Sequence, residues 1–340
     1  YCTDDNARAL LAAVKLCALP QEDWVPAEPD LPGPNDVVVA TQRYLAFLAY
    51  AWNDERRRFR NFMQYDRSWL EEVGSEDSHA RTIWALGKAV RLAPDEGVRE
   101  LAEELMAKSV PAVEDFTNLR PWAYALLGLD EYLLARPDQE PARRLHRALT
   151  ERLFARWQAN ADDDWPWWED TLTWGNAKLP HALLVAGRHL GNARAVDAAL
   201  HALRWLLGIQ RADDGHLSVI GNRGWYVRGQ EPARYDQQPI EAKALVQACL
   251  AAAAVTGEAD WAAEAGRAFR WFVGANDAEA SLYNPETGGG YDGLLPDGVN
   301  TNQGAESTLA YLLSVLEMHR YEAARRGEVP IPAAPEVDLS

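Results

Sequence analysis

The chain has 340 residues, of which 48% are hydrophobic and 25% are charged, a composition typical of a globular protein with a sizeable core. Asp and Glu number 51 against 34 Lys and Arg, and the resulting net charge of −17 argues against non-specific binding to nucleic acid or to anionic membranes. No apolar run approaches the ~18 residues that span a bilayer, and no leader-like segment opens the chain. We therefore expect a cytoplasmic protein, while loss of a leader would be compatible with secretion.

Three cysteines, Cys2, Cys17 and Cys249, are too few and too widely spaced to predict a disulfide framework or a zinc site. We expect neither a metal ion nor a cofactor. The unusual feature of the composition is 14 Trp and 12 Tyr residues, which either fill a large core or line a cleft that stacks on sugars.

One pattern recurs six times along the chain: a polar turn followed by a segment that is apolar on nearly every side. Each turn offers Asp, Asn, Ser or Thr as a helix N-cap. A helix that is apolar all round is buried on every side. The six turns are residues 3–6, 75–78, 117–120, 169–171, 235–238 and 302–304.

Amphipathic helices alternate with these buried ones. Each has one apolar stripe and one charged face, which is typical of a surface helix. Their predicted ranges are 37–52, 98–113, 141–157, 193–207 and 261–273.

This alternation predicts an all-α protein, an (α/α)6 toroid in which inner helices are ringed by outer ones. We expect a single barrel domain over residues 1–327, an extended tail over 328–340, and a sixth outer helix upstream of residue 1. In such a toroid all six polar turns meet at one mouth, where helix N-termini favour anions.

The first candidate motif is Asp4-Asp5, followed one turn later by Arg8. One Asp is enough to cap a helix, so the second carboxylate is available at the mouth. We take Asp5 as a catalytic candidate and Asp4 as a substrate-binding candidate.

The second motif runs from Met63 to Arg81 and gathers acids, arginines, a Trp and a His around one helix start. A solvated turn explains Glu71 and Glu72 better than it explains an acid on an otherwise apolar helix. His79 fits a core histidine and a functional one equally well. The candidates are Asp77 for catalysis and Asp66, Arg67, Trp69 and His79 for binding.

The third motif contains three Trp within four residues, followed by paired acids. An aromatic wall raises the pKa of a neighbouring carboxyl by desolvation, so Trp167 and Trp168 are expected to form a sugar platform beside a catalytic Asp170. The alternative is a loop anchored by its Trp residues, with Asp170 capping a helix.

The fourth motif spans residues 222–242. An acid inside a buried helix needs a partner, and for Glu241 we expect Arg223, Arg228 or a ligand. The candidates are Asp236 for catalysis and Arg223, Trp225, Gln237, Gln238 and Glu241 for substrate binding.

The fifth motif spans residues 284–306 and begins with a Gly-rich loop. The loop lacks the Lys-Ser/Thr ending of a nucleotide-binding P-loop and precedes no strand. Its candidates are Glu306 for catalysis and Tyr291, Asn302 and Gln303 for substrate binding.

Residues Trp168–Leu172, followed by Pro180, resemble the stretch that carries the catalytic Asp of unsaturated glucuronyl and rhamnogalacturonyl hydrolases. Those families are (α/α)6 barrels, and the resemblance implies that Asp170 is a general acid.

More of the chain resembles bacterial (α/α)6 proteins that accompany, or are fused to, family-4-type glycosyltransferases and mannoside phosphorylases. The resemblance implies the barrel fold, carbohydrate chemistry and association with a glycosyltransferase, and it says less about the substrate, which we expect to be an oligosaccharide. It rests on TDDNARAL (3–10), YDRSWLEEVGSEDSHAR (65–81), YDQQPIEA (235–242) and NQGAESTLAYL (302–312).

Together these patterns predict a glycoside hydrolase that uses carboxylate acid–base catalysis. We expect Asp170 or Glu306 to be the acid, and Asp236, Asp5 or Asp77 to activate water. An inverting outcome is favoured, for which the two carboxyl groups would be ~6.5–9.5 Å apart.

Two alternatives remain open. N-acylglucosamine 2-epimerases share the barrel and work through paired histidines, so a sugar epimerase or isomerase would use His79 and His181. A non-catalytic glycan-binding partner of a glycosyltransferase would bind oligosaccharide without forming a product.

Overall fold

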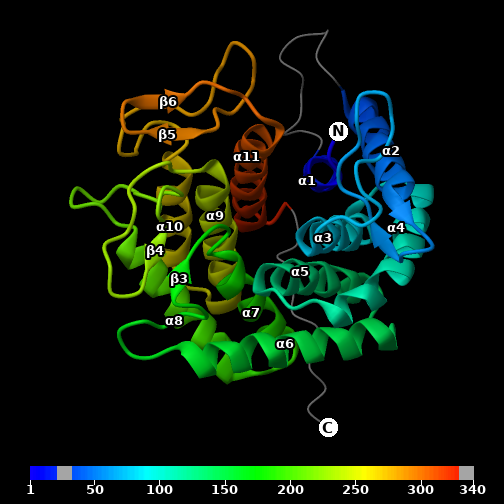
Figure 1. Cartoon of the computed structure of the whole chain (residues 1–340), viewed down its shortest axis with the longest axis horizontal. Helices are drawn as coiled ribbons and strands as arrows, with labels where there is room; N and C mark the ends of the chain where they lie inside the picture. Colours follow the sequence, from blue (N-terminus) through cyan, green and yellow to red (C-terminus); the bar gives the residue numbers. More distant parts are fainter. Residues whose placement is uncertain (21–32, 329–340) are drawn as a thin grey trace. The chain divides into compact units, whose positions relative to one another are not determined.

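The computed structural model describes residues 1–20 and 33–328, and most of them are helical (Figure 1). The helices of these residues are α1 (Thr3–Cys17), α2 (Pro34–Ala51), α3 (Glu76–Leu92), α4 (Glu96–Ser109), α5 (Leu119–Ala135), α6 (Glu140–Asn160), α7 (Lys178–His189), α8 (Ala193–Ile209), α9 (Pro239–Thr256), α10 (Ala259–Arg270) and α11 (Ala305–Arg325), with a 3-10 helix η2 (Val110–Asp115).

Strands contribute little to the described part of the chain. Three short antiparallel pairs lie in the loops between helices, and none extends into a larger sheet. They are β1 (Trp52–Asn53) with β2 (Arg58–Phe59), β3 (Thr171–Leu172) with β4 (Tyr226–Val227), and β5 (Gly293–Leu295) with β6 (Gly298–Asn300).

The chain forms two compact units, unit 1 containing Tyr1–Leu149 and unit 2 containing Thr150–Arg325. The prediction of one domain over residues 1–327 remains a prediction, and nearly all of the expected tail lies outside the described residues.

In unit 1 the helix α3 packs against both α1 and α5, and Figure 1 shows it between them. The contact with α5 is very close because glycines meet there: a Cβ on Gly128 would lie 2.5 Å from the carbonyl oxygen of Ile83, and a Cβ on Gly87 would collide with Gly128. Helices α2 and α4 pack on α1 and α3 from outside this row. The row α1–α3–α5 therefore forms the core of unit 1.

In unit 2 the helix α9 contacts α7, α10 and α11, and α8 packs on α7 (Figure 1). By length and composition alone, α9 could cross a membrane, which amends the expectation that no apolar run is long enough. However, 78% of that window is buried inside the structure. This burial is typical of a core helix.

The predicted order of helices agrees closely with the structure. All five amphipathic segments coincide with α2, α4, α6, α8 and α10, and five of the six polar turns directly precede or open α1, α3, α5, α9 and α11.

The prediction that residues 169–171 open a helix is wrong. These residues enter strand β3, which pairs with β4, and α7 begins only at Lys178. The left-handed backbone of Gly175, with φ of 60°, lies between strand and helix.

Candidate functional site

The N-terminus of α1 receives its caps from a neighbouring loop. Its N-cap residue, Cys2, makes no capping hydrogen bond with its side chain. Instead, Thr3 N donates to Asn61 O at 2.8 Å, and Asp4 N donates to Asn61 Oδ1 at 3.2 Å. Because Asn61 satisfies these amides, neither Asp4 nor Asp5 is needed as the N-cap.

The carboxylate of Asp4 lies between two buried arginines from different helices. Its Oδ2 is 3.0 Å from Nη1 of Arg8 and 3.0 Å from Nη1 of Arg81. Asp5 Oδ1 lies 2.7 Å from Arg8 Nη1. The side chains of Arg8 and Arg81 are 5% and 7% exposed, so they hold the two carboxylates in fixed positions.

Asp77, in the first turn of α3, is the unusual titratable group of this cluster. Among the described residues, no donor is hydrogen-bonded to its buried Oδ1. Its pKa is raised to about 6, mainly because burial disfavours the charged form; the Asp4 carboxylate adds to the rise, and the Arg120 guanidinium opposes it. Such a carboxyl keeps its proton in weakly acidic solution, whereas Asp4 is paired with cations.

Glu71 and Glu76, which belong to the same motif as Asp77, accept hydrogen bonds from backbone amides. Glu76 accepts hydrogen bonds from the backbone amides of Thr117 and Asn118 and, at 2.9 Å, from Asn118 Nδ2. Glu71 accepts from the amides of Asn61 and Phe62 at 2.7 and 2.6 Å. These carboxylates fix the loops around the cluster of Asp4, Asp5 and Asp77, which we call the acid cluster.

His79 is a core residue, which decides between the two interpretations of this histidine. Its side chain is fully buried, Nε2 lies 3.0 Å from Ser109 O, and its ring packs against Phe59 and Phe116. Burial lowers its pKa to about 3, and the Arg58 guanidinium lowers it further, while the hydrogen bond to Ser109 opposes the shift. The prediction that His79 binds substrate is wrong.

The remaining candidates of unit 1 lie in the loop before α3. Asp66 is exposed and accepts from both the amide and the hydroxyl of Ser68, and these bonds lower its pKa. Arg67 is also exposed, with a left-handed φ of 74°. Trp69 is half-buried between Phe47 and Tyr50, so part of its surface packs on α2.

In unit 2, Trp167 and Trp168 are fully buried, so the predicted sugar platform is wrong. Trp168 Nε1 donates to Leu153 O at 2.9 Å, and Trp167 packs against Trp205. The side chain of Asp170 is 71% exposed and neither caps a helix nor lies in an aromatic pocket. The Trp residues therefore anchor this loop, as the alternative interpretation in the sequence analysis proposed. No aromatic wall surrounds the exposed Asp170 carboxyl, so the reason for assigning it a catalytic role is lost.

Asp236 forms an ion pair with Arg223, with 3.1 Å between Oδ1 and Nε. Trp225, in the same loop, is half-buried and has a left-handed φ of 61°. These three candidates therefore lie on one loop before α9.

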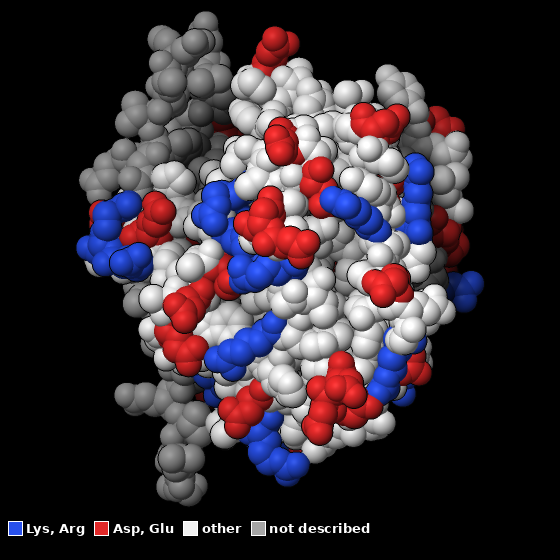
Figure 2. Space-filling view, turned by 90° about the vertical axis from the view of Figure 1, so that its left-hand side faces the viewer, with Lys and Arg blue, Asp and Glu red and all other residues white. Residues whose placement is uncertain are grey.

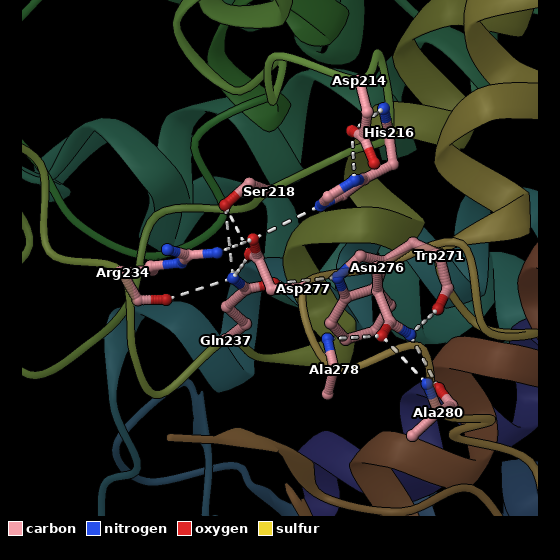
Figure 3. Close-up of polar contacts among 10 residues, drawn as sticks. All are labelled: Asp214, His216, Ser218, Arg234, Gln237, Trp271, Asn276, Asp277, Ala278 and Ala280. Atoms are coloured by element: carbon pink, nitrogen blue, oxygen red, sulfur yellow. Dashed lines mark hydrogen bonds and ion pairs between the residues drawn. The ribbon is translucent and has the colours of Figure 1, made fainter. Parts of the chain in front are cut away.

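Gln237 is fully buried in a polar network around Asp277, which sequence reasoning did not single out (Figure 3). Gln237 Nε2 and Ser218 Oγ donate to Asp277 Oδ2, the second at 2.5 Å, and Gln237 Oε1 accepts from Trp271 Nε1 at 2.9 Å. Arg234 and His216 approach Asp277 Oδ1 at 2.8 and 3.3 Å. The polar atoms of Gln237 are therefore used to join two loops rather than to bind a ligand.

Glu241 is 3% exposed on α9, and its partners include backbone amides, which the sequence analysis did not expect. It accepts hydrogen bonds from the backbone amides of Gly175 and Asn176 and from Asn176 Nδ2. It therefore holds the turn before α7. Gln238 is the N-cap residue of α9, without a capping hydrogen bond from its side chain.

The candidates of the last motif lie around α11. Asn302 Nδ2 donates to Asp292, and Gln303 Oε1 accepts from Thr287 Oγ1 at 2.5 Å; both Asn302 and Gln303 are exposed. Tyr291 and Glu306 are half-buried, Glu306 in the first turn of α11. His181 of the alternative hypothesis is 9% exposed on α7.

Within unit 1, the structure therefore holds Asp4 and Asp5 on the same arginine, Arg8, and places Asp77 near enough to Asp4 for the Asp4 charge to raise its pKa. The sequence analysis did not predict that Arg8 and Arg81 hold the carboxylates of Asp4 and Asp5. Arg8 follows Asp4 by four positions, which is one helical turn and could have indicated that pair. Arg81 is 77 positions from Asp4, so no local spacing indicated the second pair. Asp277, an isolated acid in a loop, carried no such signal.

Comparison with known proteins finds similar folds among solved structures. No family model and no curated protein matches the chain. Among solved structures it is similar to a sugar epimerase from a ruminal bacterium, with a TM-score of 0.69, 12% identity, and coverage of 94% of this chain and 87% of that one.

Two glycoside hydrolases are also similar. A GH76 α-mannanase from Bacteroides thetaiotaomicron has a TM-score of 0.62 at 11% identity, covering 95% of this chain and 87% of that chain. A glycosyl hydrolase of family 88 from Bacteroides vulgatus has a TM-score of 0.58 at 11% identity, and the match covers 94% of this chain and 92% of that chain. These likenesses confirm the predicted all-α (α/α)6 fold class.

Proposed function

We propose that the chain is a carbohydrate-active enzyme, specifically a glycoside hydrolase whose acid cluster performs acid–base catalysis on an oligosaccharide or glycoconjugate. The observation that carries the proposal is Asp77, a part-buried carboxyl with a pKa raised to about 6, next to the Asp4 carboxylate between Arg8 and Arg81. Hydrolysis of a glycosidic bond needs carboxyl groups in opposite protonation states, and different environments create that difference.

In this proposal Asp77 is the general acid that protonates the leaving oxygen, a role that differs from the water activation expected from sequence. Asp5, whose side chain is 32% exposed, is the carboxylate that activates water. Arg8 forms ion pairs with both Asp5 and Asp4. We expect inversion of the anomeric configuration, as in the sequence-based hypothesis.

The likeness to hydrolases and to a sugar epimerase supports carbohydrate chemistry in general and does not favour one reaction. The burial of His79 weighs against an epimerase that uses His79 and His181 as a pair. Association with a glycosyltransferase and a cytoplasmic location stay predictions.

The test is an NMR time course of the purified chain with mannosides, unsaturated uronides and other oligosaccharides. A new anomeric signal establishes cleavage and its configuration gives the stereochemistry. Asp77→Asn and Asp5→Asn should each lower turnover at least 100-fold, in line with loss of a catalytic acid or base. Asp138→Asn, at an exposed position between α5 and α6, is the matched control and should leave turnover unchanged.

Two results contradict the proposal. Full turnover by Asp77→Asn, in a variant whose circular dichroism matches the native chain, removes the assigned acid. Isomerised sugar without cleavage, abolished by His181→Ala, establishes the epimerase instead.

A further inference from the structure

A groove in unit 2 lies between the C-terminal half of α6 and the first turns of α8. Its volume is about 360 Å³, within the range of ~300–1,000 Å³ that is usual for small-ligand sites. None of its residues belongs to the acid cluster. The lining residues are Phe154, Trp157, Gln158, Arg194, Asp197, Ala198 and His201.

Two aromatic rings form one wall of this groove. Phe154 and Trp157 are three residues apart on α6 and so share one helix face. Their ring centroids are 6.3 Å apart, their planes differ by 14°, and both residues are half-buried. Trp157 Nε1 donates to Pro166 O at 3.3 Å, and the Arg194 guanidinium lies 5.8 Å from the Phe154 ring. The wall is therefore positioned before any ligand arrives.

The rest of the lining is mainly polar and exposed. Gln158 offers both a donor and an acceptor, Arg194 offers donors, and Asp197 offers acceptors. One positive and one negative side chain leave this rim without net charge when His201 is neutral. The face drawn in Figure 2 likewise carries Lys and Arg side chains interspersed with Asp and Glu.

We propose that this groove binds a neutral oligosaccharide. The apolar C–H faces of a sugar ring pack on aromatic faces, and the hydroxyl groups at its edge need both donors and acceptors. A lipid or an apolar peptide would make no use of the hydrogen-bonding groups of Gln158, Arg194 and Asp197, and a rim without net charge offers no excess positive charge to an acidic sugar. The proposal takes its ligand class from the proposed function but requires no catalysis.

The test uses full-length Asp77→Asn, in which turnover is expected to be at least 100-fold slower, titrated with mannotriose, cellotriose and trigalacturonate by calorimetry. We expect two neutral-sugar sites per chain, and Trp157→Ala should weaken one of them about tenfold or more, the loss expected for one aromatic contact. Trp157→Phe keeps an aromatic face and should retain that site. Tyr50→Ala, which removes an aromatic side chain that is 58% exposed on α2, is the matched control.

The same titration on the native chain separates this proposal from the proposed function. If the chain hydrolyses nothing but still binds a neutral sugar at a Trp157-dependent site, only the hydrolase proposal fails. Unchanged affinity and stoichiometry in a folded Trp157→Ala variant overturn the groove proposal. Stronger binding of trigalacturonate at this site, or a Trp157-dependent dimer in sedimentation with no effect of sugar, overturns it as well.

Discussion

Arg81 reaches across from α3 to Asp4 on α1, with 3.0 Å between Nη1 and Oδ2, although the two residues are 77 positions apart. The contact joins the first turn of α1 to the second turn of α3. The position of the acid cluster thus depends on how α1 and α3 pack, and local chain geometry alone does not determine it.

The first prediction concerns the pH dependence of hydrolysis. As a general acid, Asp77 must be protonated, and its pKa of about 6 means that kcat/KM should fall roughly tenfold per pH unit above about pH 6. The measurement is a pH–rate profile with a neutral oligosaccharide. A profile that is flat from pH 5 to 8 contradicts the role of Asp77, and Asp138→Asn should reproduce the native profile.

The second prediction concerns stability. Since the pKa of Asp77 is higher in the folded chain than in the unfolded one, the folded state binds more protons between about pH 4 and pH 6, and stability falls as pH rises through that window. Asp77→Asn should therefore be more stable than the native chain at pH 7.5 by on the order of 2 kcal/mol. Urea unfolding at pH 7.5 and 4 checks this, because the difference should largely disappear at the lower pH.

The third prediction concerns His79, whose titration lowers the stability of the fold as pH falls, whereas that of Asp77 lowers it as pH rises. The unfolded chain takes up a proton near pH 6.5, whereas the folded chain does so only near pH 3, so stability is lost as pH falls between these values. The loss amounts to about 1.4 kcal/mol per pH unit from this group alone. In urea melts between pH 6.5 and 4.5, His79→Gln should lose stability less steeply than the native chain. The exposed His319→Gln should follow the native slope.

The fourth prediction concerns the close contact between α3 and α5. A Cβ at position 128 would lie 2.5 Å from Ile83 O, so Gly128→Ala must separate the helices and should cost about 3 kcal/mol of unfolding free energy. Gly208→Ala, on the exposed surface of α8 with nothing within 4 Å of the new Cβ, should instead stabilise by about 0.5–1 kcal/mol. Equal effects of the two substitutions on thermal unfolding would contradict this contact.

The order and type of the helices were predictable because burial imposes a simple rule on the sequence. Segments such as residues 239–256 are apolar all round, and the structure buries them between other helices. The error at residues 169–171 arose because a carboxylate before an apolar segment is typical of a helix start, whereas here Leu172 pairs with Tyr226 in strands that are distant in sequence.

Site prediction depended on long-range contacts, and these are less visible in the sequence. Asp4 and Asp5 were identified because one Asp is enough to cap a helix, and Asp77 because a solvated turn does not explain an acid on an otherwise apolar helix. Trp167 and Trp168 were misplaced because a Trp cluster has the same appearance in sequence whether it stacks on a ligand or fills a core. Only packing against Trp205 and the bond to Leu153 decides between these two roles.

The capping of unit 1 by its loops has a consequence for how the unit unfolds. Asn61 completes the start of α1, while Glu76 of α3 accepts from the amides just before α5. The start of α5 thus depends on α3, and the start of α1 depends on the loop before α3, so loss of α3 and its loop exposes unsatisfied amides on both neighbours. We expect α1, α3 and α5 to open as one cooperative unit, so the acid cluster disassembles together with the core beneath it.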